Sequence, residues 1–322
     1  MRFVDRYLRI CVLAAFAVVT ACAGNSAIGV DQLPSPDGAS ATLGRKAWAD
    51  PAGSRGNLLY VTDEEANAIF VYGYDSLKFV GYIPLGSEAV GGCVDRAQNV
   101  WFTLFGGLML EFAHGGTSPI ATLSSPAMYP TNCSVDPKSG DLAVTGFGHF
   151  NGKSLEIYRH AKGQPVLYSP TYGSSGCAYD GHGNLFLDGT SSGDFNIAML
   201  SKGASDFQYF PTTTPVEYPG SMSWNDKQLV VADQSKSTVY QFRISGSTAE
   251  QIGSTTFDQS TGVGQFFIQR KRIIVPGPEG FDFVGPAYIY GYPQGGKPLR
   301  SLRNMIAPVG AVVSLGAKGG SL

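Results

Sequence analysis

Charge is scarce in this chain: Lys, Arg, Asp and Glu together make up 15% of its 322 residues. The formal net charge is −2 and no five basic residues follow one another, so the chain lacks the electrostatic footprint of a DNA- or RNA-binding protein. Long amphipathic helices are missing too, whereas 42 Gly, 19 Pro and 12% aromatic residues are typical of many short strands joined by tight turns. We expect a single all-β domain with no nucleic-acid partner.

Catalytic and metal-binding motifs are also missing. The four histidines, His114, His149, His160 and His182, show no HxH, HxxxH or HExxH spacing, so no zinc or general-base motif is present. Only His149 falls in a loop on the side where ligand binding is expected. A surface histidine without a catalytic role is the simpler interpretation.

The N-terminus has the pattern of a targeting segment. Three arginines precede the apolar stretch Ile10–Val19, which is too short to span a bilayer as a stable anchor and is typical of a signal peptide. Val19–Cys22 resembles the lipobox of bacterial lipoproteins. The resemblance implies that residues 1–22 are a signal peptide and that the Cys22 thiol carries the lipid anchor.

The predicted location is therefore the bacterial cell envelope, on its periplasmic or cell-surface side. Ala23 also resembles the sorting residue of Gram-negative lipoproteins bound for the outer membrane. A second interpretation stays open: cleavage before Gly24 would release a soluble secreted protein.

Residues 23–56 are expected to form a flexible tether. They are rich in Ser, Ala, Gly, Pro and Asp without periodicity, and such a segment cannot bury enough apolar surface to order itself. Trp48 is its one large apolar group, and we expect it to dock on the flank of the folded domain.

A repeated unit organises residues 57–322. In its clearest copy, Tyr218–Arg243, an apolar strand ending at Asp233 is followed by a polar turn and by a strand with alternating Tyr240 and Phe242. The same pattern starts at Asn57, at an offset of about 170 residues or roughly four repeats of 42–43. Equivalent apolar strands are predicted at residues 57–63, 99–103, 141–145, 184–188, 229–233 and 272–276.

Strands rich in small residues precede three of these copies, at residues 92–95, 132–136 and 176–180. Small residues suit the innermost strands of a β-propeller, which converge near its axis. The first copy has no such predecessor, whereas Pro308–Ser314 is a spare strand. We therefore predict a six-bladed β-propeller in which this C-terminal strand completes the first blade beside Leu58–Thr62 and removes two open sheet edges.

The repeat itself resembles the NHL repeat and the wider group of gluconolactonase-like propellers. The resemblance rests on Tyr-Pro-Gly220, Leu-Val-Val-Ala-Asp233 and Val-Tyr-Gln-Phe242, and at the level of repeats it covers residues 57–314. It implies architecture rather than activity, because such propellers carry many unrelated functions.

Ligands of a propeller are expected at the mouth of its axial channel, on the side where second and third strands are connected. Here the mouth should be acidic, with Lys236 as the chief cation. Converging carboxylates would bind Ca²⁺ or another divalent cation, whereas an Asp that ends a strand can instead cap the following turn. The acidic residues are Asp63, Glu64, Glu65, Asp188, Asp194, Asp233, Glu279 and Asp282.

Gluconolactonase-like proteins hold a metal with a Glu, two Asn and an Asp near the inner strands. Asn132 matches one of these places, but the corresponding places in later blades are Ser175, Gly220 and Val263, so the ligand set is incomplete. We therefore expect no cofactor and assign no catalytic residue. The candidate ligand-binding residues are Asp63, Asn132, His149, Asp188 and Asp233.

Three cysteines remain after the signal peptide and lipidation site: Cys93, Cys133 and Cys177. Cys133 and Cys177 lie three residues before an Asp, and a disulfide between them is conceivable, although adjacent inner strands could be too far apart. Cys93 lies two residues before its Asp and should point to the other face of its sheet. Small buried thiols are the default expectation.

Two functional hypotheses follow. In the first, the propeller is a non-catalytic binding or interaction module tethered to a membrane, with a small molecule, a glycan or a protein at its mouth. In the second, it is a metal-dependent hydrolase of lactone-like esters. The first is favoured, because fold analogy supplies neither a nucleophile, nor a base, nor a metal cage.

Overall fold

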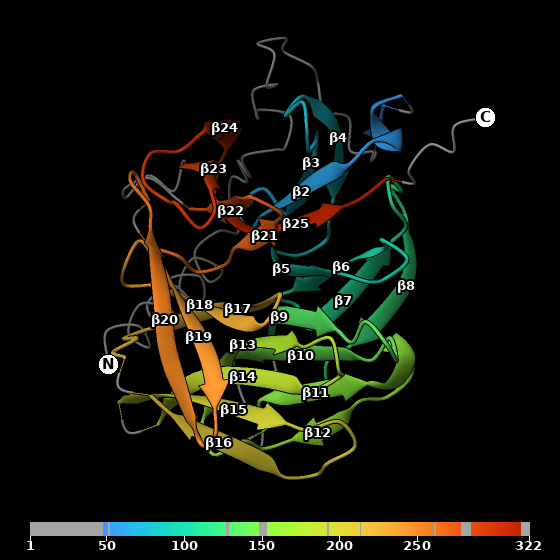
Figure 1. The fold of residues 1–322 in the computed structure, drawn as a ribbon. Helices are drawn as coiled ribbons and strands as arrows, with labels where there is room; N and C mark the ends of the chain where they lie inside the picture. Colours follow the sequence, from blue (N-terminus) through green and yellow to red (C-terminus); the bar gives the residue numbers. More distant parts are fainter. Residues whose placement is uncertain are drawn as a thin grey trace, which may run out of the picture. The chain divides into compact units, whose positions relative to one another are not determined.

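The computed structural model describes residues 48–50, 52–126, 129–147, 153–191, 193–212, 214–260, 262–277 and 285–316. They form six antiparallel sheets, each a blade of a closed ring (Figure 1). Two short 3-10 turns, η2 (Gly53–Arg55) and η4 (Arg159–Ala161), are the only helical elements in these ranges.

The blades contain the following strands. Blade 1 has β25 (Pro308–Ser314) innermost, then β2 (Leu58–Asp63), β3 (Ala68–Gly73), β4 (Phe79–Pro84) and β1 (Trp48–Ala49). Blade 2 has β5 (Ala89–Val94), β6 (Val100–Leu104), β7 (Leu108–Phe112) and β8 (Pro119–Ser124), and blade 3 has β9 (Tyr129–Val135), β10 (Leu142–Phe147), β11 (Leu155–Tyr158) and β12 (Val166–Tyr168). Blade 4 has β13 (Gly173–Tyr179), β14 (Leu185–Ser191), β15 (Asp194–Leu200) and β16 (Phe207–Pro211). Blade 5 has β17 (Pro219–Asn225), β18 (Gln228–Asp233), β19 (Thr238–Ser245) and β20 (Thr248–Thr256), and blade 6 has β21 (Phe267–Gln269), β22 (Arg272–Pro276), β23 (Gly285–Gly291) and β24 (Arg300–Met305).

The predicted six-bladed propeller is confirmed, and so is its closure. β25 pairs antiparallel with β2, with Leu58 opposite Ser314 and Thr62 opposite Gly310. In Figure 1 the red β25 lies beside the blue β2, so the two ends of the chain complete one blade. The six apolar strands expected from the repeat are β2, β6, β10, β14, β18 and β22.

The closing strand is also fastened to blade 2. The Ser314 hydroxyl donates to the carbonyl oxygen of Gln98 at 2.6 Å, and it also lies 2.6 Å from Nδ1 of His114. Nε2 of His114 lies 2.9 Å from the carbonyl oxygen of Gly56, which can only accept, so Nε2 carries a proton. Burial lowers the pKa of His114. One imidazole thus contacts both ends of the ring-forming chain.

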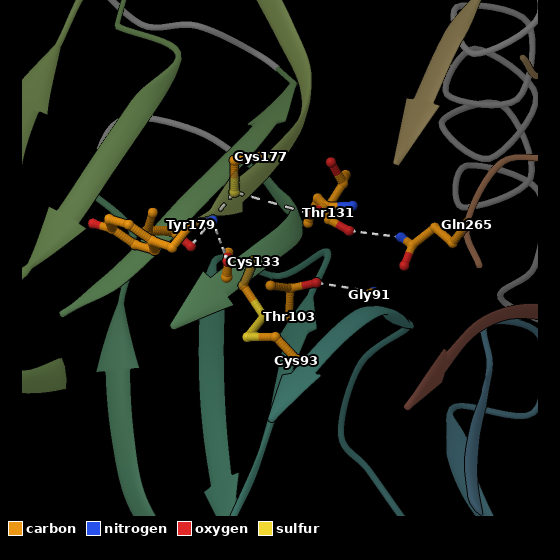
Figure 2. The surroundings of a disulfide bond; sticks show 11 residues. Gly91, Cys93, Thr103, Thr131, Cys133, Cys177, Tyr179 and Gln265 are labelled. Carbon is orange, nitrogen blue, oxygen red and sulfur yellow. Dashed lines mark hydrogen bonds between the residues drawn. A yellow bond between two sulfur atoms is a disulfide. The ribbon is translucent and has the colours of Figure 1, made fainter. Parts of the chain in front are cut away.

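Inner strands approach closely at glycines. A Cβ on Gly91 of β5 would collide with the carbonyl oxygen of Thr131 in β9, and one on Gly220 of β17 with that of Gly264. Between the strands, Nε2 of Gln265 in blade 6 donates to Thr131 O in blade 3 at 2.7 Å (Figure 2). The side chain of Gln265 therefore lies across the axis of the ring.

Apolar side chains on both faces of each sheet fill the space between neighbouring blades. Tyr60 and Val312 of blade 1 pack with Phe102 of blade 2, while Trp101 of blade 2 packs with Val144 of blade 3; all five are at most 1% exposed. Fully burying one large apolar side chain contributes about 1.5–3 kcal/mol. Packing between blades is thus the main stabilising contact of the ring.

The ordered fold begins before residue 57, the predicted start of the propeller. β1 pairs with β4, with Trp48 opposite Tyr82, so this part of the predicted tether is a fifth strand of blade 1. Cys22 and the rest of residues 1–47 lie outside the described residues. Within the described ranges, no helix has the length and apolarity needed to cross a bilayer.

The expectation of three buried thiols is wrong for Cys93 and Cys133 and holds for Cys177. Cys93 of β5 and Cys133 of β9 form a disulfide with their Cα atoms 5.7 Å apart, and Cys177 is the free thiol (Figure 2). Cys133 and Cys177 occupy equivalent places, so both side chains point toward the preceding blade and cannot meet. Cys93 is offset by one residue and points toward the following blade, where it reaches Cys133. The offset of Cys93 by one residue predicted that its side chain lies on the other face of its sheet, and this orientation is what allows the disulfide with Cys133.

Candidate functional site

Two of the aspartates predicted at the mouth accept hydrogen bonds from backbone N–H groups. Asp63, at the end of β2, is fully buried and accepts three N–H groups, from Ala66 at 2.9 Å, Ile306 at 2.7 Å and Ala307 at 3.1 Å. It thereby joins the turn after β2 to the segment that leads into β25. Burial raises the pKa of its carboxyl even though these N–H groups lower it.

Asp233 does the same at the end of β18. Its Oδ1 accepts from the Ser235 N–H at 3.0 Å and the Ser235 hydroxyl at 2.7 Å, and its Oδ2 accepts from the Glu217 N–H at 3.4 Å. Lys236 places its ammonium 3.4 Å from Glu217 and 3.8 Å from Asp233. The alternative interpretation, in which an Asp at the end of a strand caps the following turn, therefore describes both Asp63 and Asp233.

Asp188 does not occupy the same place as Asp63 and Asp233. Asp63 pairs with Pro308 and Asp233 pairs with Pro219. Asp188 instead lies opposite a bulge in β13, between the pairs Ser174–Gly189 and Cys177–Leu187. In the register of its blade, Asp188 therefore corresponds to Thr62 of blade 1 and Thr145 of blade 3, which is one residue before the position of Asp63. Those threonines donate to the carbonyl oxygens of Val90 and Ser175 in the next inner strand.

A carboxylate cannot donate such a bond. Oδ1 of Asp188 accepts from the Gly176 N–H at 2.6 Å, but its Oδ2, fully buried, has no partner among the described residues. Burial raises the pKa of Asp188 to about 7, and this effect exceeds the opposite effect of three nearby backbone N–H groups, which lower the pKa. The protonated acid could donate a bond, as the threonines do.

The remaining candidates do not gather around these aspartates. Asn132 is buried in β9, where its Oδ1 lies 4.0 Å from the Cys177 sulfur. His149, Glu279 and Asp282 lie outside the described residues. In the described part of the chain, no three His, Cys, Asp or Glu side chains come together in a way that could hold a metal ion. Asp63, Asn132, Asp188 and Asp233 each belong to a different blade.

Carboxylates do gather at the mouth between blades 1 and 2. Burial raises the pKa of Glu64 to about 7, with further contributions from the charges of Glu88, Glu65 and Asp63. Burial and the charge of Glu65 likewise raise the pKa of Glu88. Glu88 was not among the expected mouth residues, because it precedes an inner strand rather than following a second strand.

Beside these carboxylates lies an aromatic pair that sequence reasoning missed. The rings of Phe105 and Tyr129 are stacked with centroids 4.9 Å apart and planes at 8°, and Tyr129 is 40% exposed. Phe105 donates its N–H to Glu88 O at 2.9 Å, and the Gly107 carbonyl accepts from Ser125 N–H at 2.8 Å. Phe105 follows β6 of blade 2, whereas Tyr129 begins β9 of blade 3, so the pair joins two blades and no local sequence signal identifies it.

Comparison with known proteins identifies the fold alone. No family model matches the chain, and no curated protein matches its sequence. Among solved structures, the chain is similar to a protein of unknown function from Bacteroides caccae, with a TM-score of 0.62 and 14% identity over 80% of this chain and 99% of that one.

Two other structures show the same level of similarity. A chain of a nidogen/laminin complex gives a TM-score of 0.66 and 11% identity over 81% of this chain and 99% of that one. A functionally unknown protein from Desulfotomaculum acetoxidans gives a TM-score of 0.55 and 13% identity over 81% of this chain and 100% of that one. At these identities the similarity extends to the architecture, and the described residues form a six-bladed β-propeller.

Proposed function

We propose that this protein is a non-catalytic binding module of the bacterial cell envelope, an NHL-type propeller anchored through lipid on Cys22, whose mouth binds a protein partner. The observation that carries the proposal is the aromatic stack in which the half-buried ring of Phe105 lies against the exposed ring of Tyr129. Rigid aromatic side chains are enriched at protein interfaces, because they contribute large contact areas at a low cost in conformational entropy.

The charges around the stack select the partner. Glu65 and Glu88 are exposed, and they place negative charge near Phe105, whose N–H donates to the carbonyl oxygen of Glu88. Complementary charge increases the association rate and excludes acidic surfaces. We infer a partner segment with an apolar or aromatic residue for the stack and Lys or Arg for the carboxylates.

Two further features support this proposal. The propeller of similar fold in the nidogen/laminin structure belongs to a complex of two proteins. A disulfide between Cys93 and Cys133 suits an oxidising compartment such as the periplasm or cell surface. Both agree with an extracytoplasmic interaction module.

The hydrolase alternative has less support from the geometry. Asp63 and Asp233 accept backbone N–H groups and thus use the oxygens that a metal would need. The side chain of Gln265 also crosses the axis, where related metal sites would lie. We expect no lactone hydrolysis by the full chain, with or without Ca²⁺.

The experiment places a photo-crosslinking amino acid at Tyr129 in cells that produce the full chain. A matched control places it at Ile120, a 57% exposed position on the outer strand β8. We expect a discrete protein adduct from position 129 only, lost in the variant Phe105→Ala. Adducts from position 120 alone, or none from 129, would contradict the proposal.

A further inference from the structure

The face opposite the mouth has two adjoining cavities that the proposed function does not use. One lies between blades 3 and 4 with a volume of about 290 Å³, and the other between blades 2 and 3 with about 390 Å³. Asp136, Ser139 and His160 line both. The turns that join first to second strands and third to fourth strands surround them, so this face is distinct from the mouth.

The wall between the cavities is formed by η4, which has an unusual backbone. His160 and Ala161 have φ values of 50° and 51°, in the left-handed region that non-glycine residues seldom adopt. Two contacts hold His160 there: its N–H donates to Asp141 Oδ1 at 2.7 Å, and Nδ1 lies 2.7 Å from the Ser139 carbonyl oxygen. Since that carbonyl only accepts, Nδ1 carries a proton and donates it to this bond.

The cavity between blades 3 and 4 has an apolar and aromatic floor. Leu185 and Leu200 are buried at its base, and the half-buried rings of Tyr168 and Tyr179 line it. Burial raises the pKa of Tyr179, as do the nearby charges of Cys177, Asp141 and Asp136, so its hydroxyl stays protonated and able to donate. Flat apolar surfaces with hydroxyl groups at their edge suit a sugar ring, which has an apolar face and a hydroxyl rim.

The charged groups of the two cavities differ in their availability. Each carboxylate already accepts a hydrogen bond from its own blade; these are Asp95, Glu111, Asp136 and Asp141. Arg159 and Lys202 form no ion pair within the described ranges, and both are exposed. The stem of Lys202 passes beside the Asp136 carboxylate, since both approach the same side of Gly183. Its ammonium group forms no ion pair with that carboxylate within the described ranges.

We propose that these cavities bind an acidic oligosaccharide, a chain of sugar rings that carry carboxylates. One ring would lie over Tyr168 and Tyr179 with its carboxylate between Arg159 and Lys202. Arginine matches a carboxylate with two parallel hydrogen bonds, and lysine adds a point charge. The second cavity, across His160, holds the next ring and presents Arg96 and Lys138.

The test uses isothermal titration calorimetry on the full chain with tetragalacturonate as the probe. We expect binding that weakens as salt is added, and no comparable binding of the uncharged cellotetraose or of inorganic phosphate. In the double variant Arg159→Gln/Lys202→Gln the affinity should fall about tenfold or more, because both charge-assisted bonds to the carboxylate are lost.

Matched controls locate the site. Lys227→Gln removes an exposed lysine from a turn of blade 5 on the same face, and Tyr129→Ala removes the aromatic stack at the mouth; neither should change the affinity. Tyr179→Leu should weaken binding while leaving the charges in place. The proposal is overturned if tetragalacturonate does not bind at millimolar concentration, if cellotetraose or phosphate binds equally well, or if the double variant binds as the Lys227 variant does.

Discussion

At the scale of single residues, Asp63 connects two segments that are far apart in the sequence. Its carboxylate receives N–H groups from the turn after β2 and from Ile306 and Ala307, which lead into β25. The variant Asp63→Ala leaves three donors without an acceptor, of which the Ala307 N–H is buried and the other two are half-buried, and an unsatisfied buried donor costs about 1–3 kcal/mol. We expect the free energy of unfolding to fall by about 3 kcal/mol, measured by chemical denaturation.

The variant Asp233→Ala is the matched comparison. Its donors come from Ser235 and Glu217, which lie at the surface where water can replace the carboxylate. The expected loss is about 1 kcal/mol. Equal losses in the two variants would contradict the view that Asp63 fastens the closing strand.

Asp188 should make stability depend on pH. Its pKa is raised to about 7 in the folded protein, whereas an unfolded chain loses this proton near pH 4. Between these values the folded state binds more protons, so the free energy of unfolding falls as pH rises from about 4 to 7. The variant Asp188→Asn, which keeps the oxygen that accepts from Gly176, should be less sensitive to pH in this window.

Thermal melts from pH 4 to 8 measure this effect. Glu64, with a pKa also raised to about 7, acts in the same direction, so Glu64→Gln serves as a second variant and should remove a separate part of the slope. If Asp188→Asn shows the slope of the unmodified protein, the buried carboxyl is not the group that titrates.

These residues show where sequence reasoning ends. The caps at Asp63 and Asp233 could be anticipated, because an Asp at the end of a strand bonds the next turn. Asp188 looks identical in the sequence, but the bulge in β13 places it one step earlier in the register. A shift of one residue moves a side chain to the other face of a strand, and no local pattern reports it.

At the scale of elements, the closing strand decides whether the ring forms. Deleting residues 308–322 removes β25, leaves β2 with an open edge, and removes the contacts of Ser314 with Gln98 and His114. We expect loss of cooperative thermal unfolding and aggregation of the shortened chain. Deleting only residues 317–322 is the control and should leave the melt unchanged.

The disulfide between β5 and β9 is a second constraint. It closes a segment with a sequence separation of 40, which in the chain-entropy model stabilises the folded state by about 4 kcal/mol. The double variant Cys93→Ser/Cys133→Ser should lose stability of this order in denaturation experiments without reductant. The variant Cys177→Ser should retain the disulfide; burial already raises the pKa of Cys177 to about 12, so this thiol is unreactive.

At the scale of the whole molecule, the architecture was readable from the sequence and the ligand-binding surfaces were not. Repeats at a near-constant interval identify blades, and the spare strand Pro308–Ser314 identifies the closure. The stack of Phe105 on Tyr129 and the cavities beside His160 arise between blades. Such contacts join residues of different repeats, so the pattern within one repeat carries no information about them.

In the proposed function, the location of the molecule depends on the thiol of Cys22. The variant Cys22→Ser should abolish labelling with radioactive palmitate and leave an unprocessed precursor, since the thiol is the only nucleophile available for lipid transfer. Labelling together with fractionation of the envelope measures this. Labelled protein from the variant would show that the lipobox interpretation is wrong, and a processed, unlabelled parent protein would favour secretion.

The pairing of β25 with β2 has one more consequence: the point at which the chain begins is arbitrary with respect to the fold. The ends of the ring-forming chain are neighbours, with the Gly316 N–H 3.2 Å from Oδ1 of Asn57. A circular permutant, in which a short linker joins residue 316 to residue 57 and new termini open at the exposed turn 246–247 between β19 and β20, would keep the six sheets apart from β1, together with the Cys93–Cys133 bond. Blade 1 would then be covalently continuous, and the lipid anchor that we propose could be moved to a different blade without altering either face of the ring.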